Sequence, residues 1–198
     1  MKLDIKYDSN LAEMKKVIEN GGVKSMSRAI NDALAKGKTQ LGKNVCSVYA
    51  IKPHDFKSAA KVVKTYEGDL QKGKIEVQSR RLSSYHFPFT PKKYVSQKIE
   101  TDDSGKKKKT KKRTVTITIK KGQKKSYPHG FIVNPDALSN GYTLLWERNG
   151  KKINPIRSVS VAQMVENEDV YNQTMDFMKK VYEETLQEHL KKQFKVEE

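Results

Sequence analysis

The residues best suited to chemistry in this sequence are its histidines, its single cysteine and a pair of aspartates. The histidines are His54, His86, His129 and His189. They belong to separate predicted elements, and Cys46 alone cannot complete the Cys/His spacing of a zinc site. Asp102-Asp103 stands in a predicted turn with no wall to hold a substrate, which is a poor setting for acid–base catalysis. The sequence contains neither a G-x-S-x-G motif nor a glycine-rich phosphate loop. We therefore expect no catalytic residue, no metal site and no cofactor, and no enzymatic activity.

The strongest electrostatic feature is a basic run beside a predicted strand. It consists of Lys106, Lys107, Lys108, Lys109, Lys111, Lys112 and Arg113. Turn residues precede it, and the strictly alternating Thr114–Ile119 follows, so we predict a protruding hairpin over about residues 96–125 with a lysine-rich tip. Lysines without interleaved aromatic residues favour nonspecific, salt-sensitive contact with a polyanion, either DNA phosphates or an acidic protein surface. The alternative is a solvated loop without a partner. Further lysines beyond the strand extend the basic character, namely Lys120, Lys121, Lys124 and Lys125.

Two other features bear on binding. Tyr85, Phe87 and Phe89 lie beside prolines in an irregular segment, and we consider them as interface residues or, equally, as core residues. A long helix, a turn at Ile51–Pro53 and a basic helix from His54 to about Thr65 could form a helix-turn-helix. The second helix offers no Arg, Gln or Asn for base reading, so the sequence disfavours sequence-specific DNA binding.

Composition limits the class of protein. The 198 residues are 35% hydrophobic and 32% charged, and Lys+Arg 40 against Asp+Glu 23 gives a formal net charge of +17. Such an excess is best tolerated beside a polyanion or an acidic protein. Lys2 and Asp4 stand where a signal peptide needs apolar residues, and no apolar run reaches about 18 residues. We expect a protein made in the cytoplasm without a membrane partner, and a buried Cys46 in a reducing compartment.

The elements that position these residues follow from periodicity. Alternation predicts a strand over Met1–Tyr7, and helical spacing predicts a short helix with Leu11, Met14 and Ile18. A long helix follows from Val23 to Ala50. Its apolar stripe is Val23, Met26, Ile30, Ala33, Leu34, Leu41, Val45 and Val48, with Gly37 on the same face to permit close approach of a neighbour.

Strand patterns dominate the middle of the chain. Ile75 and Val77 alternate with polar residues, and further strands begin at Phe131 and run from Tyr142 to Trp146. Asn149-Gly150 is the strongest hairpin signal. An alternating Val159/Val161 segment precedes a long amphipathic helix over residues 166–194. Its apolar stripe is Tyr171, Met175, Met178, Tyr182, Leu186 and Leu190, with Glu166, Glu168 and Asp169 at its start and Lys191, Lys192 and Lys195 at its end.

Helices first, then antiparallel strands, then a closing helix indicate an α+β fold. We predict a single domain over residues 1–198: a mostly antiparallel sheet, long amphipathic helices packed on one face of it, and the basic hairpin. Residues 23–65 form its helical segment, residues 74–165 its sheet, and residues 166–194 its C-terminal helix.

Two regions of the chain share a pattern with a known family. Pro155-Ile156 and Ser160–Val165 precede an acidic segment and a long helix, and Ser27–Asn31 opens an alanine-rich helix that Tyr49–Lys52 follows. In this order, about residues 23–64 and 131–193 resemble the phage minor tail protein Z family, the tail-completion proteins of long-tailed phages. Ser158-Val159 stands where family members usually have a Gly-Pro pair.

This resemblance implies a structural role in a virion tail or a tail-like bacteriocin. The chain would be a tail-completion, tail-terminator or collar component that forms a hexameric ring at the head-proximal end of the tail tube. Implied partners are further copies of the chain, the tail tube protein, neck, connector or sheath proteins, and DNA in the tail lumen by nonspecific contact. The alternative is a nonspecific nucleic-acid-binding accessory protein that uses the lysine-rich hairpin.

Overall fold

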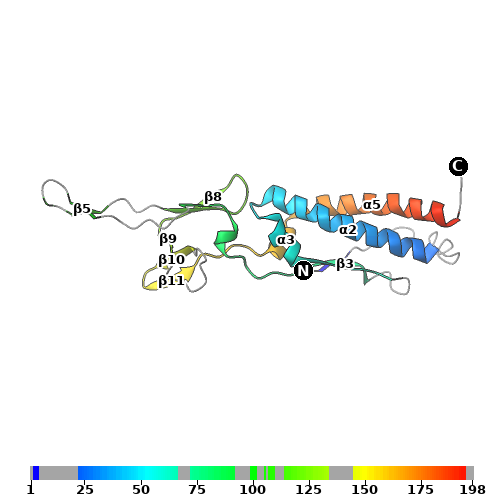
Figure 1. Ribbon diagram of the computed structural model, residues 1–198, viewed down its shortest axis with the longest axis horizontal. Coiled ribbons are helices and arrows are strands. Elements are labelled where there is room, and N and C mark those ends of the chain that lie inside the picture. Colours follow the sequence, from blue (N-terminus) through cyan, green and yellow to red (C-terminus); the bar gives the residue numbers. More distant parts are fainter. Residues whose placement is uncertain are drawn as a thin grey trace. The chain divides into compact units, whose positions relative to one another are not determined.

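Two long antiparallel helices, α2 (Val23–Val48) and α5 (Glu168–Phe194), lie side by side in the computed structural model (Figure 1). The structure describes residues 2–4, 22–66, 72–91, 99–101, 105, 107–109, 114–133 and 145–194. By its contacts the chain forms two compact units. The first comprises residues 1–48, 53–80 and 160–198, and the second residues 49–52 and 81–159.

The predicted apolar stripe of α2 is buried from Ile30 to Val45, whereas Val23, Met26 and Val48 are only half-buried. Its side chains Leu34, Leu41 and Val45 have no exposed surface. Gly37 lies so close to α5 that a β-carbon there would stand 2.5 Å from the Met178 sulfur, as its place on the stripe predicted. The helix ends at Val48 rather than Ala50. Cys46, expected to be buried, is half-buried.

Helix α5 differs from prediction in which residues face α2. Met178, Tyr182 and Leu186 are buried as expected, but Tyr171, Met175 and Leu190 are only half-buried. Their place is taken by neighbouring positions, namely Val170, Thr174, Val181 and Thr185. The two threonines tolerate burial because their hydroxyls donate to the carbonyls of Val170 and Val181, each at 2.7 Å. The predicted order of charges is confirmed by Glu168 and Asp169 in the first turn and Lys191 and Lys192 in the last. Glu166 instead ends α4, and Lys195 lies outside the described residues.

The predicted helix from His54 to Thr65 is wrong in its second half. Helix α3 (Pro53–Ala59) stops after seven residues, and β2 (Ala60–Val63) follows. The β-branched Val62 and Val63 favour a strand, and β2 pairs antiparallel with β3 (Lys74–Val77). β1 (Lys2–Asp4) pairs with the other edge of β3. Because the basic residues Lys61 and Lys64 lie beyond the helix, the helix-turn-helix alternative has no recognition helix.

A short helix replaces the predicted strand at Val159/Val161. Helix α4 (Val161–Val165) begins with a capping box, in which Ser160 Oγ accepts from the Gln163 N–H and Gln163 Oε1 accepts from the Ser160 N–H. Ser79 Oγ accepts from the Val161 N–H at 2.8 Å. These bonds satisfy backbone donors that the start of a helix would otherwise leave unpaired, so the helix outcompetes an extended conformation.

The second unit is built from short antiparallel strands. One sheet has the order β4 (Phe89–Thr90), β7 (Val115–Thr118), β8 (Lys124–Tyr127), and another has the order β11 (Lys152–Pro155), β10 (Leu145–Asn149), β9 (Gly130–Ile132). The hairpin predicted at Asn149-Gly150 is confirmed: Asn149 pairs with Lys152, and Gly150 has a φ of +61°. The buried side chains of this unit include Phe87, Val115, Ile117, Ile132, Leu145 and Ile156.

The fold class α+β is confirmed, with the described strands divided among small antiparallel sheets rather than gathered in one. The main packing of α5 is against α2. The organisation as a single domain stays a prediction. The predicted helix at residues 11–18 and the strand residues 142–144 lie outside the described residues.

Candidate interaction surfaces

The described part of the basic run, Lys107–Lys109, belongs to an antiparallel hairpin within the predicted range of about residues 96–125. β5 (Ile99–Thr101) pairs with β6 (Lys107–Lys109), and Gly105, with a φ of +74°, lies in the connection between them. The pairing places Lys107, Lys108 and Lys109 on the returning strand rather than at the tip. Lys106, Lys111, Lys112 and Arg113 lie outside the described residues. Contact between this run and a polyanion therefore stays a prediction.

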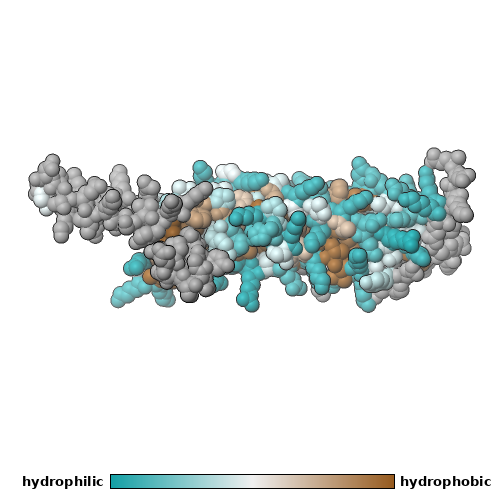
Figure 2. Space-filling model, in the orientation of Figure 1, coloured by the Kyte–Doolittle hydropathy of each residue, from teal (hydrophilic) through white to brown (hydrophobic). Residues whose placement is uncertain are grey.

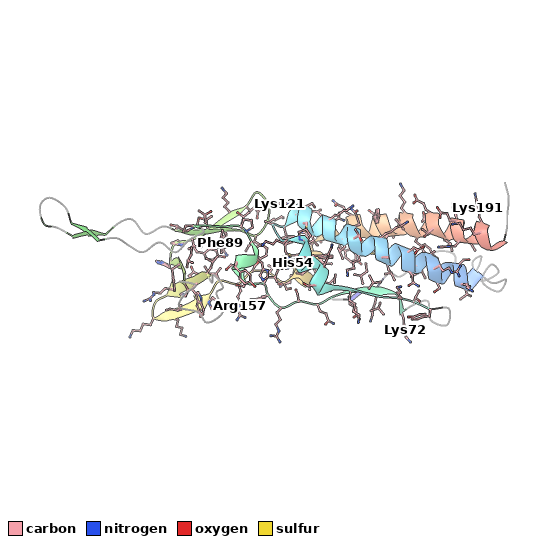
Figure 3. The ribbon with its side chains drawn as sticks, viewed as in Figure 1. His54, Lys72, Phe89, Lys121, Arg157 and Lys191 are labelled. Atoms are coloured by element: carbon pink, nitrogen blue, oxygen red, sulfur yellow. The ribbon has the colours of Figure 1, made fainter. Side chains whose placement is uncertain are left out.

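The three aromatic residues proposed for an interface have different environments. Phe87 is 2% exposed and belongs to the core of its unit. Phe89, which Figure 3 labels, is half-buried on β4. It pairs across the sheet with Ile117. Tyr85 is 36% exposed, and its ring stacks on His86 with 4.1 Å between ring centroids. Tyr85 is the member of the three that a partner could reach most readily.

Positive charge is distributed unequally between the two units. The residues of the second unit include 20 of the 40 lysines and arginines but 5 of the 23 acidic residues, a formal net charge of +15. The first unit contains the remaining 20 basic and 18 acidic residues, a net charge of +2. No Asp or Glu occurs between Asp103 and Asp136. Polyanion contact is therefore expected of the second unit, because the fields of unopposed lysines add.

The sequence marked the four lysines after β7 as basic but did not predict which element or turn each one belongs to. Lys120, Lys121, Lys124 and Lys125 are all exposed, in the turn before β8 and on β8 itself (Figure 3 labels Lys121). Lys125 Nζ lies 5.3 Å from the centroid of the Tyr127 ring. Hydrophilic side chains cover most of the described surface in the view of Figure 2. The strict Thr114–Ile119 alternation was the signal for this sheet, because it fixed which side chains face outward.

Two of the histidines lie beside an aspartate. His54 Nε2 lies 3.1 Å from Asp55, and His189 Nε2 lies 3.0 Å from Asp32 across the α2–α5 contact. Within the described residues, no group of three or more His, Cys, Asp or Glu is placed to hold a metal ion. Burial raises the pKa of the Tyr182 hydroxyl above its usual value.

The residues behind the sequence resemblance serve the fold. Asn31 Nδ2 donates to the Thr65 carbonyl at 3.0 Å, and Asn31 Oδ1 accepts from the Thr65 N–H at 2.9 Å. Ser27 Oγ donates to the same carbonyl at 3.3 Å. The Ala50 N–H donates to the Ile119 carbonyl at 2.9 Å, which ties the segment after α2 to the end of β7. The shared pattern therefore marks positions that join distant parts of each unit.

Among the described residues, no helix has the apolar length needed to cross a membrane. Comparison with models of known families gives a match to the one described as prophage minor tail protein Z (GPZ), over residues 9–197. This match spans both units and nearly the whole chain. No curated protein and no solved structure gives a significant match.

Proposed function

Because the chain belongs to the prophage minor tail protein Z family, we propose that it completes the tail as a ring at the head-proximal end of the tail tube. A structural role in a phage tail follows from the family. The ring, its hexameric symmetry and its action as a terminator, completion factor or collar are the finer proposal. The same ring would suit a tail-like bacteriocin, whose tube also needs a defined end.

The observation that supports this proposal most is the extent of the family match. A match over residues 9–197 includes the helical unit and the basic unit together, so both belong to the family's common architecture. A nearly neutral helical unit, with its net charge of +2, can lie beside identical copies without strong repulsion. The +15 unit instead favours acidic neighbours, either the tube or the DNA in its lumen.

Assembly requires surfaces that remain open in the isolated chain. The edge strand β11 is exposed along its whole length, and Ile153 on it is 45% exposed. The exposed Tyr85 belongs to the same unit. Such edges pair readily with other chains. On this basic unit we expect the tail tube protein and neck, connector or sheath proteins as partners, and neighbouring copies at the near-neutral helical unit.

A second candidate function is a nonspecific nucleic-acid-binding accessory protein, which the concentrated positive charge favours. In that case Lys→Gln substitutions at positions 106–109 would abolish retention on a DNA column and leave particle assembly intact. If the chain is instead a tail-end component, substitutions that remove its contact surface would prevent it from capping the tube or joining the tail to the head.

The proposal is tested by electron microscopy of the purified protein, alone and mixed with tail tubes. We expect rings in the preparation, and rings seated at one end of each tube. A protein that stays monomeric with tubes present, or that decorates the tube along its length, would contradict the proposed role. Mass photometry of the same sample gives the number of subunits per ring.

A further inference from the structure

Within the strands β4, β7 and β8, one face of the sheet carries only hydroxyl and ammonium side chains. Val115 and Ile117 of β7 are buried, so the alternate residues Thr116 and Thr118 point to the opposite face. The register places Thr90 and Ser126 on either side of Thr116, and Lys124 beside Thr118. Directly paired residues share a face of the sheet, so these five side chains lie together.

This face is open and polar. Thr90, Ser126 and Lys124 are exposed, and Thr116 and Thr118 are half-buried. The hydroxyl oxygens of Thr116 and Ser126 lie 3.5 Å apart, so neighbouring strands present their hydroxyl groups side by side. The exposed Lys120 and Lys121 stand in the turn that connects β7 to β8. None of these residues is apolar, and none is acidic.

We propose that this hydroxyl and lysine face, consisting of Thr90, Thr116, Thr118, Ser126 and Lys124 with Lys120 and Lys121, binds the phosphate backbone of duplex DNA without regard to sequence. Ser and Thr hydroxyls and Lys ammonium groups are the ordinary donors to phosphate oxygens. The proposed site includes no residue of the lysine run at 106–113, and the proposal does not depend on the ring or on its place in the tail.

The side chains favour phosphate over an acidic protein as the ligand. Protein interfaces are enriched in aromatic residues, Met and Arg at their centre and depleted in Lys and Ser. This face has the opposite composition, with threonine, serine and lysine and no arginine or aromatic side chain. It also offers no Arg, Asn or Gln for bidentate contacts to base edges, so the expected binding is nonspecific.

Two adjacent lysines provide a matched pair for the test. Lys124 pairs with Thr118 and lies on the proposed face, whereas Lys125 pairs with Ile117 and lies on the other face, near the Tyr127 ring. Lys124→Gln and Lys125→Gln remove the same charge one residue apart. Binding of a labelled 30-base-pair duplex would be measured by fluorescence anisotropy over a series of salt concentrations, with the full-length protein.

We expect Lys124→Gln to weaken DNA binding about fivefold to tenfold near 0.1 M salt and to lower the slope of log K against log salt by about 1. Lys125→Gln should leave both quantities close to wild type. Thr116→Val with Ser126→Ala should weaken binding with no change in the slope, because lost hydroxyl bonds release no counterions. Equal effects of the two lysine variants would overturn the proposal.

A larger matched set separates a built surface from general charge. We expect the slope of log K against log salt to fall by about 3 in the triple variant Lys120→Gln/Lys121→Gln/Lys124→Gln. A second triple variant, Arg148→Gln/Lys151→Gln/Lys152→Gln, removes the same charge from the exposed β10–β11 hairpin. We expect it to lower the slope by less than 1. Polyglutamate serves as the competing ligand. Equal losses in the two triple variants, or equally tight binding of polyglutamate, would contradict a phosphate surface.

Unchanged circular dichroism in all variants shows that the fold is retained. If the protein forms rings but does not bind DNA, the DNA-binding inference is wrong and the proposed ring stands. If it binds DNA but forms no rings, the proposed ring is wrong and the DNA-binding inference stands.

Discussion

At the scale of single residues, the α2–α5 contact is specified by buried polar bonds as well as by apolar packing. Asn44 Nδ2 donates to Thr174 Oγ1 at 2.9 Å, and both residues are buried. The Thr174 hydroxyl donates in turn to the Val170 carbonyl. A shift of either helix would leave these groups unpaired, which costs about 1–3 kcal/mol for each buried group. These bonds therefore fix the register of the two helices.

The polar pair at Asn44 and Thr174 can be tested by a double-mutant cycle. Thr174→Val leaves the Asn44 amide without this partner, and we expect it to lower the free energy of unfolding by about 1–3 kcal/mol. Adding Asn44→Leu to that variant should restore most of the loss, because both polar groups are then gone. Urea unfolding measures the four proteins of the cycle. Additive losses would show that the bond does not couple the helices.

The close approach at Gly37 makes an equally specific prediction. Gly37→Ala should destabilise the protein by about 1 kcal/mol, because overpacking against Met178 outweighs the helix propensity that alanine gains. In a Met178→Ala background the same substitution should stabilise by about 1 kcal/mol, since the obstacle is absent. Thermal unfolding of both pairs measures the change of sign. The same sign in both backgrounds would place the helices farther apart than described.

At the scale of elements, local signals decided which predictions held. The strict alternation in residues 114–119 predicted β7, and Asn149-Gly150 predicted the β10–β11 hairpin. The predicted third helix failed because Val62 and Val63 gain more from pairing with β3 than from extending α3. Thr174 and Thr185 could not be assigned to the buried face of α5 from sequence, because their burial depends on bonds to the preceding turn. The alternation predicted the outward-facing threonines of the candidate DNA face. The remaining residues of that face could not be predicted, because assigning them requires the register of β4 and β8 against β7.

The start of α4 depends on one capping residue. Ser160→Ala should lower the free energy of unfolding by about 1 kcal/mol, because the Gln163 N–H loses its acceptor at a helix start. Ser47→Ala, in the last turn of α2, is the matched control and should change stability by less than 0.5 kcal/mol because that serine is exposed. Chemical denaturation distinguishes them. Equal effects would mean that the capping box contributes nothing at this junction.

At the scale of the whole molecule, the two units are interleaved along the chain. The second unit takes residues 49–52 from between α2 and α3 and residues 81–159 from between β3 and α4. Neither unit is one continuous segment, and the first unit is complete only after residues 160–198 follow the second unit along the chain. Net charge follows the same division, with +15 in one unit and +2 in the other. The molecule thus combines a near-neutral helical part with a strongly basic sheet part.

This interleaving predicts one cooperative unfolding transition. Trp146 is the only tryptophan and belongs to the second unit, whereas α2 and α5 of the first unit dominate the helical circular dichroism. Tryptophan fluorescence and circular dichroism should therefore give the same urea midpoint if the chain behaves as a single domain. A fluorescence midpoint clearly below the helical one would show that the basic unit unfolds by itself.

The place of the chain in the particle is tested most directly by a gold label on its C-terminus in complete particles viewed by electron microscopy. The proposed role predicts label at one position in every particle, the junction of the tail tube with the head. Label along the tube, at the distal tip, or absent from purified particles would contradict it.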